Sequence, residues 1–458
     1  MGHLHLIFCR TVLAQELHTH PSPETMAIAE RLRTEPHFPR QMATAVLTTS
    51  FLRENPLIGR ASELHTLITA YQRAQRGHPQ VVILAGEAGI GKTRLAREFL
   101  DRMAAQGADV LWGQALATED NLPYQPLVEA LRRRIAQEHA PEHLLENFWL
   151  AELSSLLPEL QQRHPDLLLP LLDKATARIR LFEAVTRLFQ ALARRAPVVL
   201  FIDDLQGADI ASLNLLSYAL RRWQENEGPI LVLLNVRAEA LGTRPKLADW
   251  LDALERAVPV TRLTLDPLSY QDTLRLVQAL GTADAEGRLD PAITADLGQL
   301  GHWLFHETQG HPLYVLETLK ALLDLGILRS DPQRPEEWVA DFAIAARDTA
   351  VLQHFLPPGV QAAIRSRLAP LSTHARTLLT AAAVLGHSFT FDQLCQVAGL
   401  EVDSALTALD ELLRNLLLRE HAGTYAFTHD KIRAVIYAQA GEARRHILHR
   451  RAQQANRN

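Results

Sequence analysis

The amino-acid sequence predicts an α/β fold with a parallel sheet, followed by a helical region and a small domain of helices and one hairpin. Short apolar runs alternate with long amphipathic helical patterns between residues 57 and 265, which is typical of a parallel sheet covered by helices on both faces. Beyond Pro267 the strand-like runs stop and helical periodicity takes over. A chain of 458 residues has room for several such domains.

Five apolar runs rich in Val, Leu and Ile are the predicted strands of the sheet. They cover residues 81–85, 110–112, 198–202, 230–236 and 260–265. The carboxyl ends of parallel strands meet at one edge of the sheet, and ligands bind at that edge. Polar residues directly after these runs are therefore the first candidates for a functional site.

The region after the sheet is expected to be helical, with helices at residues 270–280, 292–308 and 313–325. After residues 356–359 the pattern is three helices, two short strands at 416–419 and 424–427 around a turn at 421–423, and one further helix. Three helices with a small hairpin form a winged-helix pattern. The basic residues between 444 and 451 are interpreted as the solvated face of a helix.

Breaks in these patterns set the expected domain boundaries. The expected domains are a helical segment at 1–35, a linker at 36–55, the α/β core at 56–266, the helical region at 267–355, the winged helix at 356–440 and a basic C-terminal helix at 441–458. Pro36 and Pro39 interrupt two helical patterns, which marks the linker. The helical segment before it is too small to fold alone.

Composition excludes several classes of protein. The chain has a formal net charge of -5 and a pI near 6.5, so no global attraction to nucleic acid or to an anionic membrane is expected. Only Cys9 and Cys395 occur, which excludes a disulfide framework and a four-cysteine zinc site and favours a cytoplasmic location. No apolar run approaches the roughly 20 residues that a membrane-spanning helix needs.

The strongest motif follows the first predicted strand and opens a helix. It consists of Gly86, Glu87, Ala88, Gly89, Ile90, Gly91, Lys92 and Thr93, with Arg94 next on the helix. This is a complete P-loop, in which glycines let the backbone turn so that N–H groups and the helix dipole face bound phosphates. We expect Lys92 to bridge the β and γ phosphates, Thr93 to ligate Mg²⁺ and Arg94 to join the nucleotide-binding set.

Two carboxylates and an arginine follow other strands at the same edge. Asp203 and Asp204 end the run 198–202, and Asp203 is the expected Mg²⁺ residue while Asp204 would polarise the attacking water. Arg237 ends the run 230–236 and could contact the γ phosphate, so Lys92, Asp203, Asp204 and Arg237 form the expected catalytic set. On the residues alone, Arg237 could equally be an exposed arginine that starts a loop.

From residue 57 onward, the motifs in their order resemble the signal-transduction ATPases with numerous domains (STAND), in the branch of bacterial transcriptional regulators with an AAA-like module. The motifs are Leu57-Ile58-Gly59-Arg60 with Glu63, the P-loop, Pro123-Tyr124-Gln125-Pro126-Leu127, Asp203-Asp204-Leu205-Gln206, Arg237, Gly310-His311-Pro312 and Thr428-His429-Asp430. The resemblance implies a P-loop NTPase core with a parallel sheet, an all-α lid at 267–355 and a winged-helix domain. It also implies ATP or ADP with Mg²⁺ as the cofactors.

The resemblance assigns further residues to the nucleotide. Ile58, Gly59 and Arg60 are similar to the segment that lies against adenine and ribose, and Pro312 is similar to the lid proline that packs on the base. His429 is similar to the winged-helix histidine that reaches the β phosphate of ADP, although the residues alone also allow a plain helix cap. The family logic is a switch in which ADP holds a closed state, and ATP with a protein or small-molecule inducer allows self-association.

The ends of the chain and two departures refine this expectation. Residues 1–35 resemble the closing helices of the bacterial transcriptional activator domain, and residues 441–458 are a possible start of missing sensor repeats. Gly207 stands where the related motif has tryptophan, and no glutamate follows Asp203, which favours slow turnover.

Three interpretations follow. The first is a slow regulatory ATPase. The second is a nucleotide-binding interaction module or truncated remnant without useful turnover, and the third is a DNA-binding regulator that acts through the winged helix. Direct DNA binding is disfavoured because the helix with His429 is poor in base-reading residues. His302 and His306 have the spacing of a zinc pair but lack the intervening glutamate, so packing or surface roles are expected.

Overall fold

The computed structural model describes most of the chain beyond residue 56. The described residues are 57–115, 123–138, 143–165, 167, 174–281, 291–325, 327–330, 338–340 and 356–455. They all belong to one compact unit, Pro56–Asn458. The expected helical segment at 1–35 and linker at 36–55 lie outside the described residues. Within the described part, none of the helices combines the length and apolarity that crossing a membrane requires.

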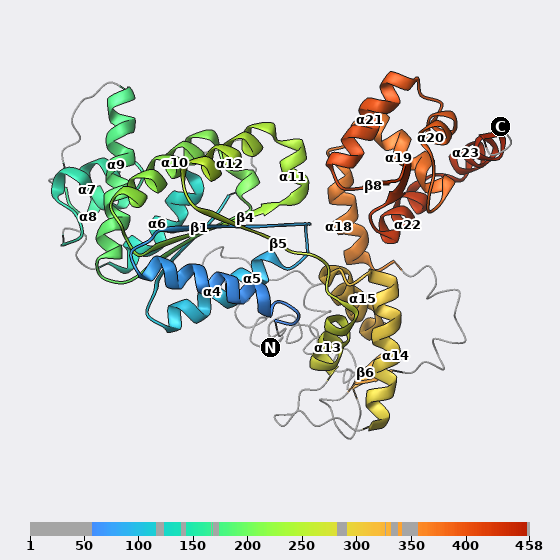
Figure 1. Cartoon of the computed structure of the whole chain (residues 1–458), viewed down its shortest axis with the longest axis horizontal. Helices are drawn as coiled ribbons and strands as arrows, with labels where there is room; N and C mark the ends of the chain where they lie inside the picture. Colours follow the sequence, from blue (N-terminus) through green and yellow to red (C-terminus); the bar gives the residue numbers. More distant parts are fainter. Residues whose placement is uncertain are drawn as a thin grey trace, which may run out of the picture. The chain divides into compact units, whose positions relative to one another are not determined.

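A five-stranded parallel sheet lies at the centre of the α/β core, in the order β2-β3-β4-β1-β5 (Figure 1). The strands are β1 (Gln80–Gly86), β2 (Asp109–Gln114), β3 (Val198–Asp203), β4 (Ile230–Arg237) and β5 (Val260–Thr264). The predicted strands are confirmed to within two residues at each end. Strand β4 lies between β1 and β3, so three motif-bearing strands are neighbours.

Helices cover both faces of the sheet, as the alternating pattern predicted (Figure 1). They are α4 (Ala61–Gln75), α5 (Lys92–Ala105), α6 (Gln125–Gln137), α7 (Asn147–Ser154), α8 (Pro158–Arg163), α9 (Lys174–Ala193), α10 (Ile210–Glu225), α11 (Ala238–Thr243) and α12 (Pro245–Ala257). Val82 and Leu84 of β1 pack with α4 and α5, while Val81 and Ile83 pack in a second apolar cluster with α6, α9, α10 and α12. Both faces of each central strand are therefore buried, which explains their continuous apolar sequence.

The region after the sheet contains the three predicted helices, but it is not purely helical. The helices are α13 (Tyr270–Gly281), α14 (Pro291–Thr308) and α15 (Pro312–Asp324). Strands β6 (Leu328–Ser330) and β7 (Trp338–Ala340) then pair antiparallel, so the prediction of an all-α lid is wrong. Strands of three residues are too short for a periodic signal, and this pair forms because it packs on α14 and α15.

The C-terminal helices form a separate apolar cluster. Within residues 356–455 the elements are α18 (Pro358–Leu368), α19 (Thr373–Leu385), α20 (Phe391–Ala398), α21 (Val402–Arg414), β8 (Leu418–His421), β9 (Thr424–Phe427), α22 (Asp430–Gln439) and α23 (Glu442–Ala455). Four helices precede the hairpin, where the sequence predicted three. The hairpin starts two residues later than predicted because Leu416 has a positive φ of 51°. Ala422 and Gly423, with φ of 48° and 78°, form its two-residue turn.

Helix α23 packs on the same cluster through Leu448 and Ala452. Arg444, Arg450 and Arg451 on this helix are exposed. The prediction of a solvated basic face is therefore confirmed, and the apolar side of this helix is covered by the helices before it.

Candidate functional site

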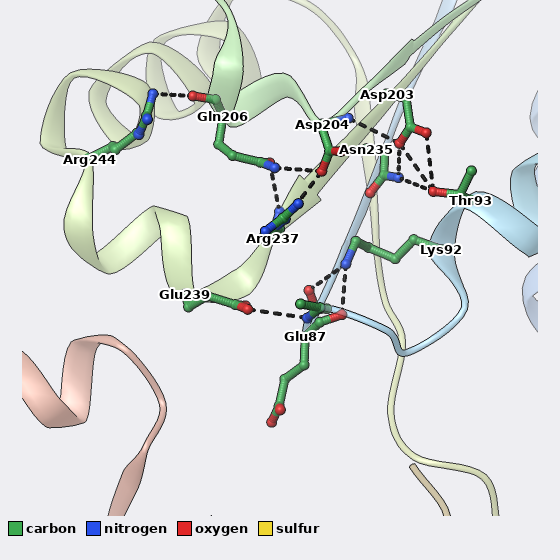
Figure 2. Close-up of polar contacts among 12 residues, drawn as sticks. Glu87, Lys92, Thr93, Asp203, Asp204, Gln206, Asn235, Arg237, Glu239 and Arg244 are labelled. Carbon is green, nitrogen blue, oxygen red and sulfur yellow. Dashed lines mark hydrogen bonds and ion pairs between the residues drawn. The ribbon is translucent and has the colours of Figure 1, made fainter. Parts of the chain in front are cut away.

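The P-loop joins β1 to α5 at the carboxyl edge of the sheet (Figure 2). Gly89 and Gly91 have φ of 82° and 102°, a region that residues with a Cβ rarely adopt. Gly91 directly precedes Lys92, the first residue of α5. The helix N-terminus and the turning backbone therefore present N–H groups at one concavity, which suits an anion.

Lys92 is buried against the loop that it follows. Its Nζ donates hydrogen bonds of 2.8 Å to the carbonyl oxygens of Gly86 and Glu87. Burial lowers the pKa of Lys92 to about 8, and Glu239 opposes this shift more strongly than Asp204 or Asp203 does. A cation held at the mouth of an anion-binding loop fits a phosphate-binding role.

One hydrogen-bonded cluster joins Thr93 of α5 to Asp203, at the end of β3, and Asn235, near the end of β4 (Figure 2). Thr93 Oγ1 lies 3.2 Å from both carboxylate oxygens of Asp203. Asn235 Nδ2 donates to Thr93 Oγ1 at 3.2 Å and to Asp203 Oδ1. Because β4 lies between β1 and β3, Asn235 is the residue that bridges the two motifs.

Asp203 is the buried carboxylate of the site. Burial raises its pKa, the neighbouring Asp204 raises it further, and hydrogen bonds from Asn235 and Thr93 oppose both effects. Hydroxyl and carboxylate oxygens are the ligand atoms that Mg²⁺ prefers, usually together with waters and substrate phosphates. Thr93 and Asp203 thus fit a magnesium ion by their chemistry. Among the described residues, no group of three or more His, Cys, Asp or Glu side chains could hold a metal ion. A magnesium ion at Thr93 and Asp203 would therefore need waters and substrate phosphates as its other ligands.

Asp204 lies at the same edge but in a different hydrogen-bond network. Its φ of 53° turns the chain away from β3, and its Oδ1 accepts from Gln206 Nε2 at 2.6 Å and from Arg237 Nε at 3.2 Å. Gln206 Oε1 accepts from the Arg237 backbone N–H at 3.1 Å. Arg237 is 45% exposed, so its guanidinium is accessible beside the loop although it is ion-paired.

Glu239 reaches the loop from the first turn of α11, two residues after Arg237 (Figure 2). Its Oε1 accepts a hydrogen bond of 3.2 Å from the backbone N–H of Ala88. Its Oε2 is buried without a hydrogen-bond partner among the described residues. The backbone N–H of Ala88, one of the donors that the P-loop would present to phosphate, is therefore already hydrogen-bonded to the Glu239 carboxylate.

Residues 58–60 lie beside the loop. Arg60 is 6% exposed and donates through Nη2 to the carbonyl oxygens of Ile90, at 3.2 Å, and Asp266, at 2.6 Å. Gly59 has a φ of 69°, and a Cβ there would lie 2.7 Å from Cγ of Asp272. Ile58 is partly buried. The segment is thus fixed next to the loop, and its predicted contact with adenine and ribose stays a prediction.

A second group of side chains meets the loop from the C-terminal half of the chain. Glu87 Oε2 lies 3.2 Å from Arg367 Nη1 of α18 and 3.4 Å from His429 Nε2. Burial alone would raise the pKa of Glu87, but His429 and Arg367 lower it to about 2. Arg367 also donates to the carbonyl oxygens of Asn415 and Leu416, so it links the loop to the end of α21.

His311 is a fully buried residue of this group. It stacks on Tyr314 at a centroid distance of 4.2 Å and meets His429 edge-on at 5.5 Å. Neither of its ring nitrogens has a hydrogen-bond partner among the described residues. Burial and the adjacent His429 lower its pKa to about 3, and the negative charge of Glu87 opposes this only in part.

The structure brings most of the predicted site residues together. One cavity of about 240 Å³ is lined by Ala88, Gly89, Gly91, Lys92, Thr93, Arg94, Asp204, Asn235 and Arg237. Asp203 is hydrogen-bonded to Thr93, and His429 contacts the loop through Glu87. Pro312 is the first residue of α15, and its predicted packing on the base stays a prediction.

Three residues of the site were missed by the sequence reasoning. Asn235 had a signal, since it is the polar side chain inside an otherwise apolar strand. Glu239 and Arg367 had none, because neither lies in a motif or at a strand end. His302 and His306 are exposed on α14, with ring centroids 5.0 Å apart, in agreement with the expected surface role.

Comparison with known proteins shows what the core is similar to. A family model described as AAA ATPase domain matches residues 56–233, which lie within the α/β core. A curated relative from Rhizobium meliloti (strain 1021), described as an uncharacterized protein, is 29% identical over 427 residues. That match covers 86% of this chain and 36% of the relative, so the chain spans about a third of the relative's length.

Two solved structures resemble the described fold. The Walker-type ATPase of Pyrococcus abyssi has 15% sequence identity and a TM-score of 0.50, over 83% of this chain and 96% of that protein. The ORC2 protein of Aeropyrum pernix, solved as ADPNP and ADP complexes, has 14% identity and a TM-score of 0.51, over 89% and 98% of the two chains. At these identities the likeness shows a shared fold and no more.

Proposed function

We propose that the AAA ATPase domain of this chain binds ATP and ADP with Mg²⁺ and acts as a nucleotide-controlled regulatory switch of the STAND type. The observation that carries the proposal is the contact of Glu87 in the P-loop with Arg367 and His429 of the C-terminal helices. A nucleotide on this loop would lie beside groups from two distant segments. Its binding energy then depends on how these segments are arranged, which is the physical requirement for a switch.

The residues at the sheet edge have separate roles in this proposal. The loop amides and Lys92 would bind phosphates, and Thr93 with Asp203 would hold the magnesium ion, which neutralises phosphate charge when bound. Asp204 would orient the attacking water and accept its proton as the bond between the γ phosphorus and the bridging oxygen of ADP breaks, and Arg237 would contact the γ phosphate. Asp204 is held by Arg237 and Gln206, and a carboxylate shared between two donors is less available to accept a proton. This supports slow turnover.

The base is proposed to bind between the segment 58–60 and the start of α15. Arg60 fixes that segment to Ile90 and Asp266, and Pro312 begins the helix that carries Tyr314. His311 at the start of the same helix lies against Gly89, where a Cβ would be 3.1 Å from the imidazole Cε1. A nucleotide would thus touch both the core and the helical region.

We further propose domain boundaries at 56–266, 267–355 and 356–440, with the last region as a winged helix. His429 would contact the β phosphate of ADP. Its Nε2 lies 3.4 Å from Glu87 Oε2, so the imidazole is already beside the loop. Lys431 on the same helix is buried and paired with Glu307 of α14, so this face is used within the chain. That contact favours a regulatory role over direct DNA binding. Self-association in the ATP state, an inducer and a cytoplasmic location complete the proposal.

Identification of bound nucleotide tests the proposal first. The full chain is purified gently and denatured, and released nucleotide is identified and quantified by chromatography. Near-stoichiometric ADP is expected from the wild type, and little from Lys92→Ala. An empty protein that also fails to take up ATP with Mg²⁺ contradicts the proposal.

Turnover separates the two remaining interpretations. Slow ATP hydrolysis above the background of Lys92→Ala is expected for a switch that resets itself. Equal rates for both proteins, with ADP bound to the wild type, would instead identify a nucleotide-binding module without turnover. The ion-paired state of Asp204 is the observation that keeps this second function open.

A further inference from the structure

Glu239 places a negative charge on the phosphate-binding loop. Its Oε1 accepts a hydrogen bond of 3.2 Å from the backbone N–H of Ala88, and Figure 2 shows the side chain extending from the first turn of α11 toward the loop. Its second oxygen, Oε2, is buried and has no hydrogen-bond partner among the described residues. The carboxylate is thus directed at the loop, although only one of its two oxygens accepts a hydrogen bond there.

The contact is not explained by the needs of α11. That helix is anchored by the buried Ala240 and by the hydrogen bond that the Arg237 backbone N–H, at its start, donates to Gln206 Oε1. A glutamate in the first turn of a helix can extend into water, where both oxygens are solvated. Glu239 instead keeps one buried oxygen without a donor, which is unfavourable unless the position has another role.

The position of Glu239 makes it a competitor of phosphate. Carboxylate and phosphate oxygens require the same charge-assisted donors, and the N–H of Ala88 is one of those on the loop. The N–H of Ala88 lies in the same loop as Lys92, the lysine that reaches the β and γ phosphates in P-loops.

We propose that Glu239 is a specificity-determining residue that lowers the affinity of the site for ATP relative to ADP. A triphosphate carries one more phosphate group and more negative charge than a diphosphate, so it requires more of the loop donors and of Lys92. It must displace the Glu239 carboxylate or bind beside it against charge repulsion. A diphosphate makes a smaller demand. This inference rests on the proposed function, because it assumes that nucleotide binds at the P-loop.

The proposal is tested by the ratio of two dissociation constants. The affinities of the full chain for ADP and for ATP are measured by isothermal titration calorimetry with Mg²⁺, after removal of bound nucleotide, for the wild type, Glu239→Gln and Glu239→Ala. Glutamine keeps the size of the side chain and an oxygen that can accept from Ala88, so it removes only the charge. Glu225→Gln, on the exposed end of α10 and paired with Arg222, is the matched control.

The expected result is an ATP-to-ADP ratio of dissociation constants above one in the wild type. We expect Glu239→Gln to lower this ratio by about tenfold, equivalent to about 1.4 kcal/mol, mainly through tighter ATP binding. Glu239→Ala should lower it similarly, and the control should leave it unchanged. If the two Glu239 variants bind ATP and the wild type does not, the result would also support competition between the Glu239 carboxylate and phosphate.

Two outcomes overturn the inference. A ratio that is the same in the wild type and both Glu239 variants shows that the carboxylate does not discriminate between the nucleotides. Loss of ATP turnover in Glu239→Gln with an unchanged ratio would assign the residue to the reaction step instead. If neither nucleotide binds to any of the proteins, the proposed function itself fails, and the inference fails with it.

Discussion

Replacement of His311 by phenylalanine should make the chain less sensitive to mild acid. His311 is fully buried, and burial together with His429 lowers its pKa from 6.5 to about 3. In the unfolded chain the imidazole is expected to titrate near its usual value. Between these two pKa values the unfolded state binds more protons than the folded state, so stability falls as the pH falls. Phenylalanine keeps a ring against Tyr314 and cannot be protonated.

The size of the effect follows from the two pKa values. His311 stays neutral in the folded state and is protonated in the unfolded state. This protonation lowers the free energy of unfolding by about 1.4 kcal/mol at pH 5.5 and by about 0.2 kcal/mol at pH 7. The wild type should therefore lose about 1 kcal/mol more than His311→Phe over this interval. The pKa of Glu87, lowered to about 2 from 4.5, matters only below this window, since its contribution is lost as the pH falls below 4.5. The interval therefore isolates the histidine.

Urea unfolding at pH 7 and pH 5.5, after removal of bound nucleotide, measures the difference. His374→Gln, which removes an exposed imidazole of α19, is the control and should keep the loss seen in the wild type. Equal losses for the wild type and His311→Phe would contradict this prediction, because they would mean that His311 is protonated within the folded protein.

Two further predictions concern contacts within the fold. Asn235→Leu removes the amide that donates a hydrogen bond to Asp203 inside the sheet. We therefore expect the free energy of unfolding, measured by urea titration, to fall by about 1–3 kcal/mol. An unchanged unfolding midpoint would contradict this role of Asn235. Gly242→Ala should destabilise the chain by about 1–3 kcal/mol, because its Cβ would lie 2.9 Å from the backbone oxygen of Arg414 at the end of α21. Gly228→Ala, whose nearest neighbour would be 3.7 Å away, is its control in thermal unfolding, and equal melting shifts for the two variants would exclude the close approach.

Local pattern predicted most of the core and its central motif. The strands β1, β3 and β4 have continuous apolar sequences because both of their faces are buried, and such runs can be identified without knowledge of their partners. Lys92 and Thr93 follow one strand and Asp203 ends another, and their types and spacing state the chemistry directly. The hairpin at the C-terminus was also predictable, from a turn with Gly423 between two short strands.

The errors came from features that depend on distant partners. Strands β6 and β7 have three residues each, and they form a ladder only because α14 and α15 support them. The extra helix before the hairpin was missed because helices of ordinary length can be merged or divided in a continuous helical pattern. In both cases packing against other elements decided the local structure.

A parallel sheet with a phosphate-binding loop and a carboxylate at its edge was predictable from the sequence alone, because these features are encoded within short segments. The strand order required the three-dimensional structure, in which β4 lies between β1 and β3 and makes Asn235 the bridge between Thr93 and Asp203. The three-dimensional structure also brings Arg367 to Glu87, 280 residues away in the chain. Strand order and long-range ion pairs are set by how helices and sheet bury their apolar faces together, and no local periodicity records that choice.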